Sequence, residues 1–138
     1  MTEERMKKRI TSILISAILI ASLFTFTGCG SSSGDTIKIG TLGPYSGDTA
    51  MYGEAAKNGI QLAVDQVNND GGINGKQVEL VSYDTKGDTT EAVSAYKRLV
   101  NEDSVVGIVG PVLSGEALAI KDAATEDNIP MVTPTATA

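Results

Sequence analysis

The chain has 138 residues, of which 41% are hydrophobic and 20% charged, a composition typical of a globular protein rather than a disordered one. With 17 Asp and Glu against 11 Lys and Arg, its formal charge of −6 offers no basic face to a phosphate backbone, so no nucleic-acid partner is expected. Because the chain has no His and one Cys, zinc, haem and Cys–His catalysis lack their usual ligands and bases, and no cofactor is predicted.

Residues 1–28 have the pattern of a secretory signal peptide. Basic residues at 7–9 are followed by an uncharged stretch at 10–26 and then by small residues. Met6 is as suitable a start as Met1. The alternative is a membrane-spanning helix, but the uncharged stretch contains several Ser and Thr and is at the short end of the range that crosses a bilayer.

Cys29 follows this segment directly. The sequence at 26–29, Phe-Thr-Gly-Cys, resembles a bacterial lipobox, with Phe where Leu is commoner. The resemblance implies that Cys29 carries a diacylglyceryl group, becomes the mature N-terminus and anchors the protein to a lipid bilayer through two acyl chains. Residues 29–35 are then the lipidated Cys and a flexible Gly/Ser tether. The protein is expected on the outer face of the bacterial cytoplasmic membrane or on its periplasmic side.

From residue 36 onward, strand and helix signals alternate. Short runs rich in Ile and Val predict four strands, at 36–42, 77–83, 105–109 and 131–133. Helical spacing of apolar residues predicts three helices, at 53–67, 88–100 and 114–126. Asp88 and Glu91 have the spacing of a capping box at the start of the second helix.

This alternation predicts a doubly wound α/β domain with a parallel sheet, because each crossover is long enough to join parallel strands. No closing helix follows the last predicted strand. The sequence is therefore expected to be an N-terminal fragment of a longer protein.

In an open parallel sheet, ligands bind beyond the carboxyl ends of the strands. The predicted ends are rich in Gly, Ser and Thr and poor in general bases, at 42–47, 83–85, 110–115 and 133–137. Such residues, with a helix beginning at Ser114, are suited to a small carboxylate ligand. They are equally common in turns that close strands, and composition alone does not separate the two interpretations.

An ordered series of short motifs resembles the leucine/isoleucine/valine-binding proteins of ABC importers. The motifs are IKIG at 37–40, GPYSG at 43–47, YG at 52–53, NGIQLA at 58–63, NNDGGINGK at 68–76, YD at 83–84, VGP at 109–111, Ser114, and PMVTPTAT at 130–137. The resemblance implies the type I periplasmic binding protein fold, in which two α/β lobes joined by crossing strands close on a ligand. Residues 36–138 would be an incomplete N-terminal lobe.

The same resemblance implies four ligand-binding positions. Ser114 is expected to hold the ligand α-carboxylate, and Thr137 to contact both the carboxylate and the ammonium group. Thr135 stands where the family offers a main-chain carbonyl to the ammonium group, usually from Ala, and Tyr52 is expected to form an aromatic wall. The extra hydroxyl at 135, and Gly-Glu at 115–116 in place of a hydroxyl-rich run, leave the exact ligand open.

Three functional classes are compatible with these residues. The leading one is a lipid-anchored solute-binding protein that delivers an amino acid, in the first instance branched-chain, to an ABC permease. The second is a ligand-sensing domain of the same fold in a receptor or signalling protein, and the binding of amides or urea-like solutes is a further alternative. An extracytoplasmic enzyme is the weakest, because Asp84 is the one candidate base at the predicted strand ends and no nucleophile accompanies it.

Overall fold

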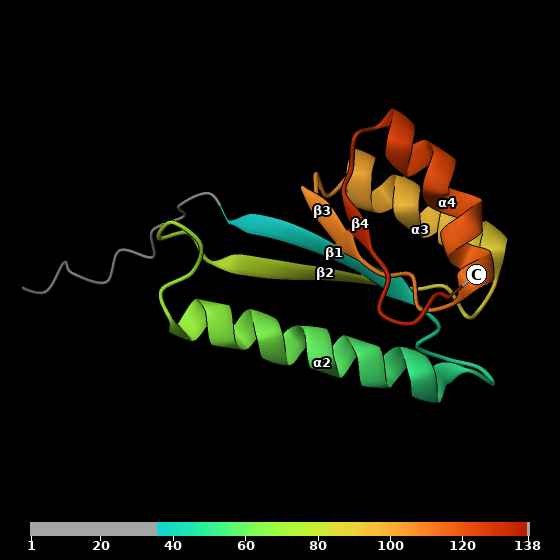
Figure 1. Cartoon of the computed structure of the whole chain (residues 1–138), viewed down its shortest axis with the longest axis horizontal. Coiled ribbons are helices and arrows are strands. Elements are labelled where there is room, and N and C mark those ends of the chain that lie inside the picture. The colour runs from blue at the N-terminus through green and yellow to red at the C-terminus, as the bar shows by residue number, and fades with distance from the viewer. Residues whose placement is uncertain (1–35, 138) are drawn as a thin grey trace, which may run out of the picture. The chain divides into compact units, whose positions relative to one another are not determined.

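The computed structural model describes residues 36–137 (Figure 1). Its elements run in the order β1 (Ile37–Gly43), α2 (Ala50–Asn69), β2 (Val78–Asp84), α3 (Thr89–Asn101), β3 (Gly107–Val109), α4 (Ser114–Glu126) and β4 (Met131–Val132). All seven predicted elements are present, and α4 begins and ends where the sequence predicts. The predicted signal peptide, Cys29 and the whole predicted tether lie outside the described residues. Within the described part, no helix is both long and apolar enough to cross a membrane.

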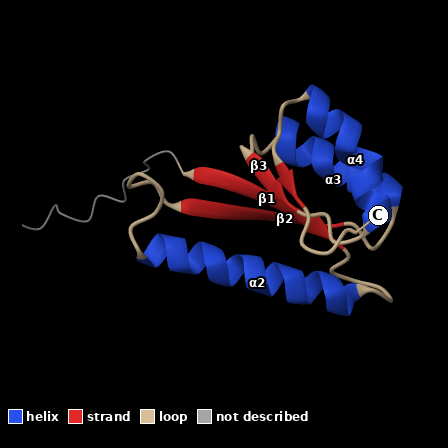
Figure 2. Ribbon diagram, viewed as in Figure 1, coloured by secondary structure: helices blue, strands red, loops and turns tan. Residues whose placement is uncertain are grey.

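The four strands form one parallel sheet in the order β2-β1-β3-β4 (Figure 2). β1 and β2 pair along their whole length, from Ile37 opposite Val78 to Gly43 opposite Asp84. The first crossover moves to one side of β1 and the second returns to its other side, so the winding direction reverses at β1. This order confirms the doubly wound α/β class. It also places the switch point, where such folds bind ligands, at the carboxyl ends of β1 and β3.

Helices lie on both faces of the sheet (Figure 1). α3 and α4 cover one face and bury the main apolar core, in which Leu42 from β1, Leu99 from α3 and Ile120 from α4 are fully enclosed. α2 covers the other face less completely. An apolar hollow of about 250 Å³ remains there, lined by Ile39, Ile60, Ala63, Val64, Val67, Ile73, Val78 and Val109. This lining comes mainly from the body of α2 and the first halves of β1 and β2, so the hollow is separate from the loops that follow the strands.

α2 begins at Ala50, three residues before the predicted start at Gly53. Gly53 is buried, and a Cβ on it would lie 2.0 Å from the carbonyl oxygen of Pro44. Gly53 therefore does not begin the helix. It allows the first turns of α2 to approach the loop after β1, and this contact brings the start of α2 to the carboxyl edge of the sheet.

Local side chains close the other crossovers. The Asn68 side chain accepts from the N–H of Val78 at 2.7 Å and donates to its carbonyl at 2.8 Å, which joins the end of α2 to the start of β2. Asp88 caps α3 as predicted, accepting from the N–H groups of Thr90 and Glu91 at 2.8 and 2.9 Å. The N–H of Asp88 donates to the Thr85 carbonyl rather than to Glu91, so the second half of the predicted capping box does not form.

Candidate functional site

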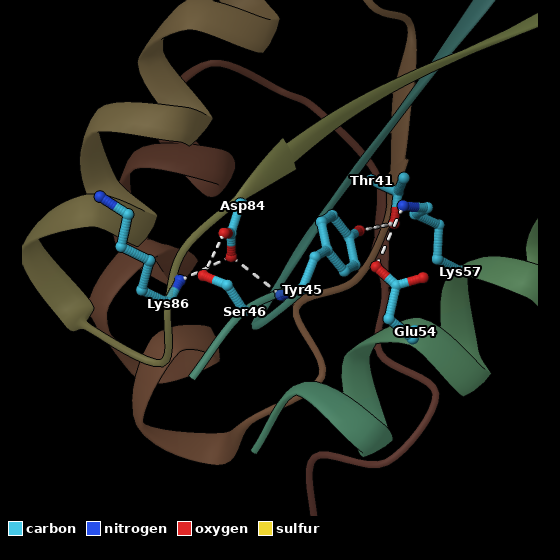
Figure 3. Close-up of polar contacts among 7 residues, drawn as sticks. All are labelled: Thr41, Tyr45, Ser46, Glu54, Lys57, Asp84 and Lys86. Atoms are coloured by element: carbon cyan, nitrogen blue, oxygen red, sulfur yellow. Dashed lines mark hydrogen bonds and ion pairs between the residues drawn. The ribbon is translucent and has the colours of Figure 1, made fainter. Parts of the chain in front are cut away.

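The loops that follow the four parallel strands lie at one edge of the sheet. Side-chain hydrogen bonds join the loop after β2 to the loop after β1 and to the start of α4, and the segment after β4 to the loop after β3. Asp84 connects the end of β2 to the loop after β1 (Figure 3). Its carboxylate accepts from the N–H of Tyr45 at 2.8 Å, the hydroxyl of Ser46 at 2.5 Å and the N–H of Lys86 at 2.9 Å.

Partial burial raises the pKa of Asp84, but the hydrogen bonds from Ser46, Lys86 and Tyr45 together outweigh it and hold the pKa below its usual value. A carboxylate with a lowered pKa and three donors is suited to holding a loop, and poorly suited to accepting a proton. The one candidate base that the sequence offered at the strand ends is therefore a structural acceptor here.

Tyr45 connects the loop after β1 to α2 (Figure 3). Its hydroxyl shares a hydrogen bond of 3.0 Å with the hydroxyl of Thr41. The ammonium group of Lys57 lies 4.6 Å from the centre of the Tyr45 ring and 3.2 Å from the carboxylate of Glu54. Burial raises the pKa of Tyr45 to about 12, so the phenol stays neutral under physiological conditions. Sequence reasoning did not select Tyr45, although its GPYSG context at a strand end was a usable signal.

Three of the four predicted ligand-binding residues come together beside the start of α4. Ser114 is the first residue of that helix, and its Oγ accepts from the N–H of Thr137 at 3.2 Å. The hydroxyl of Thr135 donates to the carbonyl of Val112 at 2.5 Å. The extra hydroxyl at position 135 is thus bound within the protein, and it ties the segment after β4 to the loop after β3.

Tyr52 lies in the first turn of α2 and is 59% exposed. Because its neighbour Gly53 packs on Pro44, Tyr52 belongs to the same edge of the sheet as Ser114. Among the contacts described for residues 36–137, no hydrogen bond of the Tyr52 side chain joins it to the other three residues.

The starts of α3 and α4 differ in a way that bears on ligand binding. Asp88 satisfies the first N–H groups of α3 with its own side chain. At the start of α4 the N-cap is Leu113, and no side-chain cap bond is formed there. An N-terminal turn without a cap presents N–H groups and a partial positive charge to an anion. This turn lies at the end of β3, which is one side of the switch point.

Glu116 lies in the same turn and belongs to the site, although the sequence marks it only as a departure from the family pattern. Its side chain is 1% exposed, and Oε1 accepts a hydrogen bond from the hydroxyl of Thr85, which is also fully buried. Oε2 is buried without a hydrogen-bond partner among the described residues. Burial raises the pKa of Glu116, although the hydrogen bonds from Thr85 and the Leu113 backbone oppose that shift.

No group of three or more His, Cys, Asp or Glu side chains is arranged to hold a metal ion within the described range. Beside the carboxylates of Asp84 and Glu116, the edge carries hydroxyls, backbone N–H groups and the rings of Tyr45 and Tyr52. Such groups can bind and orient a small polar molecule.

Known proteins resemble this chain throughout the part that holds the site. The sequence pattern of the periplasmic binding protein family matches residues 36–138. The Leu/Ile/Val-binding protein BraC3 of Rhizobium johnstonii is 39% identical over 131 residues, which cover 95% of this chain and 33% of that protein. The chemotactic signal transduction substrate-binding protein BasB of Halobacterium salinarum is 39% identical over 108 residues, covering 77% of this chain and 26% of that protein.

A solved structure gives the same result. The branched-chain amino acid transporter substrate-binding protein LivJ of Streptococcus pneumoniae, in complex with isoleucine, has a TM-score of 0.73 and 45% sequence identity. The match covers 75% of this chain and 30% of LivJ. The chain thus spans about a quarter to a third of the length of these curated relatives.

Proposed function

Since the chain belongs to the periplasmic binding protein family, we propose that it is the N-terminal part of an extracytoplasmic solute-binding lipoprotein that captures a branched-chain amino acid for an ABC importer. The observation that carries this proposal is the pairing of Ser114 with Thr137 at the uncapped start of α4. The relatives named as Leu/Ile/Val-binding, and the isoleucine bound to LivJ, support the class of ligand.

The ligand α-carboxylate is placed at the first turn of α4. Ser114 Oγ already accepts from the N–H of Thr137, so its own proton is available to the ligand. A hydrogen bond to a carboxylate is shorter and stronger than one between neutral groups. The first N–H groups of α4 add their dipole to the same position.

The rest of the amino acid extends along the same edge. The carbonyl of Thr135 and the hydroxyl of Thr137 are the groups of this chain proposed to contact the ammonium group. The hydroxyl of Thr135 is engaged with Val112, which holds that carbonyl in a fixed place rather than adding a ligand contact. The exposed ring of Tyr52 provides an apolar wall for the aliphatic side chain. Three acidic side chains near the edge already have donors: Asp84 binds three, Asp88 caps α3, and Glu116 accepts from Thr85 through Oε1. The counter-charge for the ammonium group is therefore assigned to a second lobe.

Capture, rather than chemical conversion, is the proposed activity, because Asp84 is held as a hydrogen-bond acceptor with a lowered pKa. Cys29 is proposed to carry the lipid that keeps the protein at the membrane beside its permease. Two acyl chains give stable anchoring where one chain is marginal.

Titration calorimetry on the full-length protein tests this proposal. Isoleucine, leucine and valine should bind, and 2-methylbutylamine, which is isoleucine without its carboxylate, should bind at least about a hundredfold more weakly because the groups at α4 lose their partner. Equal affinity for isoleucine and the amine would contradict the carboxylate site.

A ligand-sensing role is the second candidate, and the similarity to the chemotactic protein BasB favours it. Both roles use the same binding site. Deleting the gene should abolish uptake of labelled isoleucine if the protein serves a permease. Normal uptake together with a lost behavioural response to isoleucine would assign it to sensing.

A further inference from the structure

A buried side-chain link joins the first turn of α4 to the ends of β1 and β2. Thr85 follows β2 and is fully buried, and its N–H donates to the carbonyl of Gly43, the last residue of β1, at 2.9 Å. Its hydroxyl donates to Oε1 of Glu116, the third residue of α4. The position of α4 therefore depends on a residue whose own place is set by the strand ends.

Ser114 lies two residues before Glu116 in the same helical turn. The N-cap residue Leu113 has no side-chain cap bond, and its backbone interacts with the carboxylate of Glu116 itself. A shift of the turn would move Ser114 Oγ and the first N–H groups together. Because Glu116 is only two residues from Ser114, the Thr85–Glu116 bond fixes the position of Ser114 Oγ and of the first N–H groups of α4.

We propose that Glu116 is a positioning residue for the carboxylate site, holding the first turn of α4 against Thr85 so that Ser114 and the helix N–H groups meet the ligand. The inference rests on the proposed function, since it needs a carboxylate at Ser114. Glu116 does not itself contact the ligand and acts through the geometry of α4.

The charge of Glu116 gives this role a measurable signature. The ionisable groups that face it are Asp84, Asp88 and Tyr45. Hydrogen bonds keep the pKa values of both Asp carboxyls below normal despite the opposing effect of desolvation, and burial keeps Tyr45 neutral up to a pKa of about 12. The chain has no His. Of the three carboxyl groups, Glu116 is the one whose pKa is raised above its usual value, because the side chain is buried.

The sign of the pH effect follows from position. An ionised Glu116 draws on the same N-terminal dipole as the ligand carboxylate and adds a negative charge near it. Affinity for the ligand should therefore be highest when Glu116 is protonated, and should fall as the pH rises through its pKa.

The test uses the full-length protein, isoleucine as the probe and titration calorimetry. Thr85→Val, which keeps the shape and removes the donor, and Glu116→Ala should each weaken binding about tenfold. Thr85→Ser, which keeps the hydroxyl, should stay within about threefold of wild type. The isoleucine affinity of the double variant Thr85→Val/Glu116→Ala should lie within about twofold of the weaker-binding single variant. All three variants lose the same Thr85–Glu116 hydrogen bond, so the second substitution has little left to remove.

The pH profile separates positioning from a purely structural role. Wild-type affinity should fall as the pH rises through the raised pKa of Glu116, and Glu116→Gln should remove that slope while keeping an acceptor for Thr85. The same slope in wild type and Glu116→Gln, or unchanged affinity in both Thr85→Val and Glu116→Ala, would overturn the inference. If Glu116→Ala does not fold, Thr85→Val and Glu116→Gln decide the question.

The Ser114→Ala variant distinguishes failure of the proposed function from failure of this inference. If Ser114→Ala binds isoleucine with wild-type affinity, the carboxylate site itself is wrong. If Ser114→Ala binds weakly but the Thr85 and Glu116 variants bind with wild-type affinity, only the role of Glu116 is wrong.

Discussion

Replacing Ser114 by Ala in the full-length protein is the sharpest test of the carboxylate site. The change removes one hydroxyl from the start of α4 and leaves the helix intact, because Ala is the best helix former and Ser114 is not the N-cap. Two interactions are lost: the bond that Ser114 Oγ accepts from Thr137 at 3.2 Å, and the bond that it donates to the ligand carboxylate.

A hydrogen bond to a charged group contributes about 1.5–3 kcal/mol, so isoleucine affinity should fall roughly tenfold to hundredfold. Titration calorimetry measures this loss directly. Ser114→Thr, which restores a hydroxyl, should recover most of the affinity. Lys121→Ala is the matched control on the same helix, since that side chain is exposed and makes only a 4.0 Å ion pair with its neighbour Asp122. Wild-type affinity in Ser114→Ala would refute the placement of the ligand carboxylate.

Three further outcomes are expected. Cys29→Ala should abolish lipid labelling and release the protein from the membrane fraction, whereas membrane retention without label would mean that residues 10–26 act as a spanning anchor. Gly53→Ala should lower the unfolding free energy by about 1–3 kcal/mol, because the new Cβ would lie 2.0 Å from the Pro44 oxygen; in the same helix Gly59→Ala meets no atom within 4 Å and should not destabilise. Asp88→Ala should lower the melting temperature, and Asp88→Ser should largely restore it. Hydrogen bonds lower the pKa of Asp88 in the folded state below its unfolded value. The difference in melting temperature between wild type and Asp88→Ala should therefore be present above the unfolded pKa and should shrink as the pH falls through the folded pKa.

Local sequence was sufficient where local physics decides the structure. α3 combines a capping side chain at Asp88 with an apolar stripe at helical spacing, and it forms where predicted. α4 matches its predicted bounds, and parallel pairing follows from crossovers too long for hairpins. The family resemblance also named Ser114, Thr135 and Thr137, which the structure brings to one edge.

The predicted starts of β3 and α2 were wrong, because in both places a tertiary contact determines the structure. The apolar run at 105–109 predicts a five-residue strand, but β3 begins only at Gly107. The N–H of Val105 donates instead to the carbonyl of Leu99 at the end of α3. Gly53 resembles a helix start in sequence, yet its small size serves the close approach of Pro44 within the first turns of α2.

The sequence alone therefore determined the fold class, the order of the elements and the edge of the sheet that carries the site, because periodicity, capping and chain direction are encoded within a few residues of one another. Only the tertiary structure decided which side chains meet across that edge. Thr137 reaches Ser114 over 23 residues and Thr85 reaches Glu116 over 31. A Glu in the first turn of a helix is usually solvated at the surface. Nothing near Glu116 in the sequence marks it as buried, because its burial arises from the packing of α4 against the end of a strand from another part of the chain.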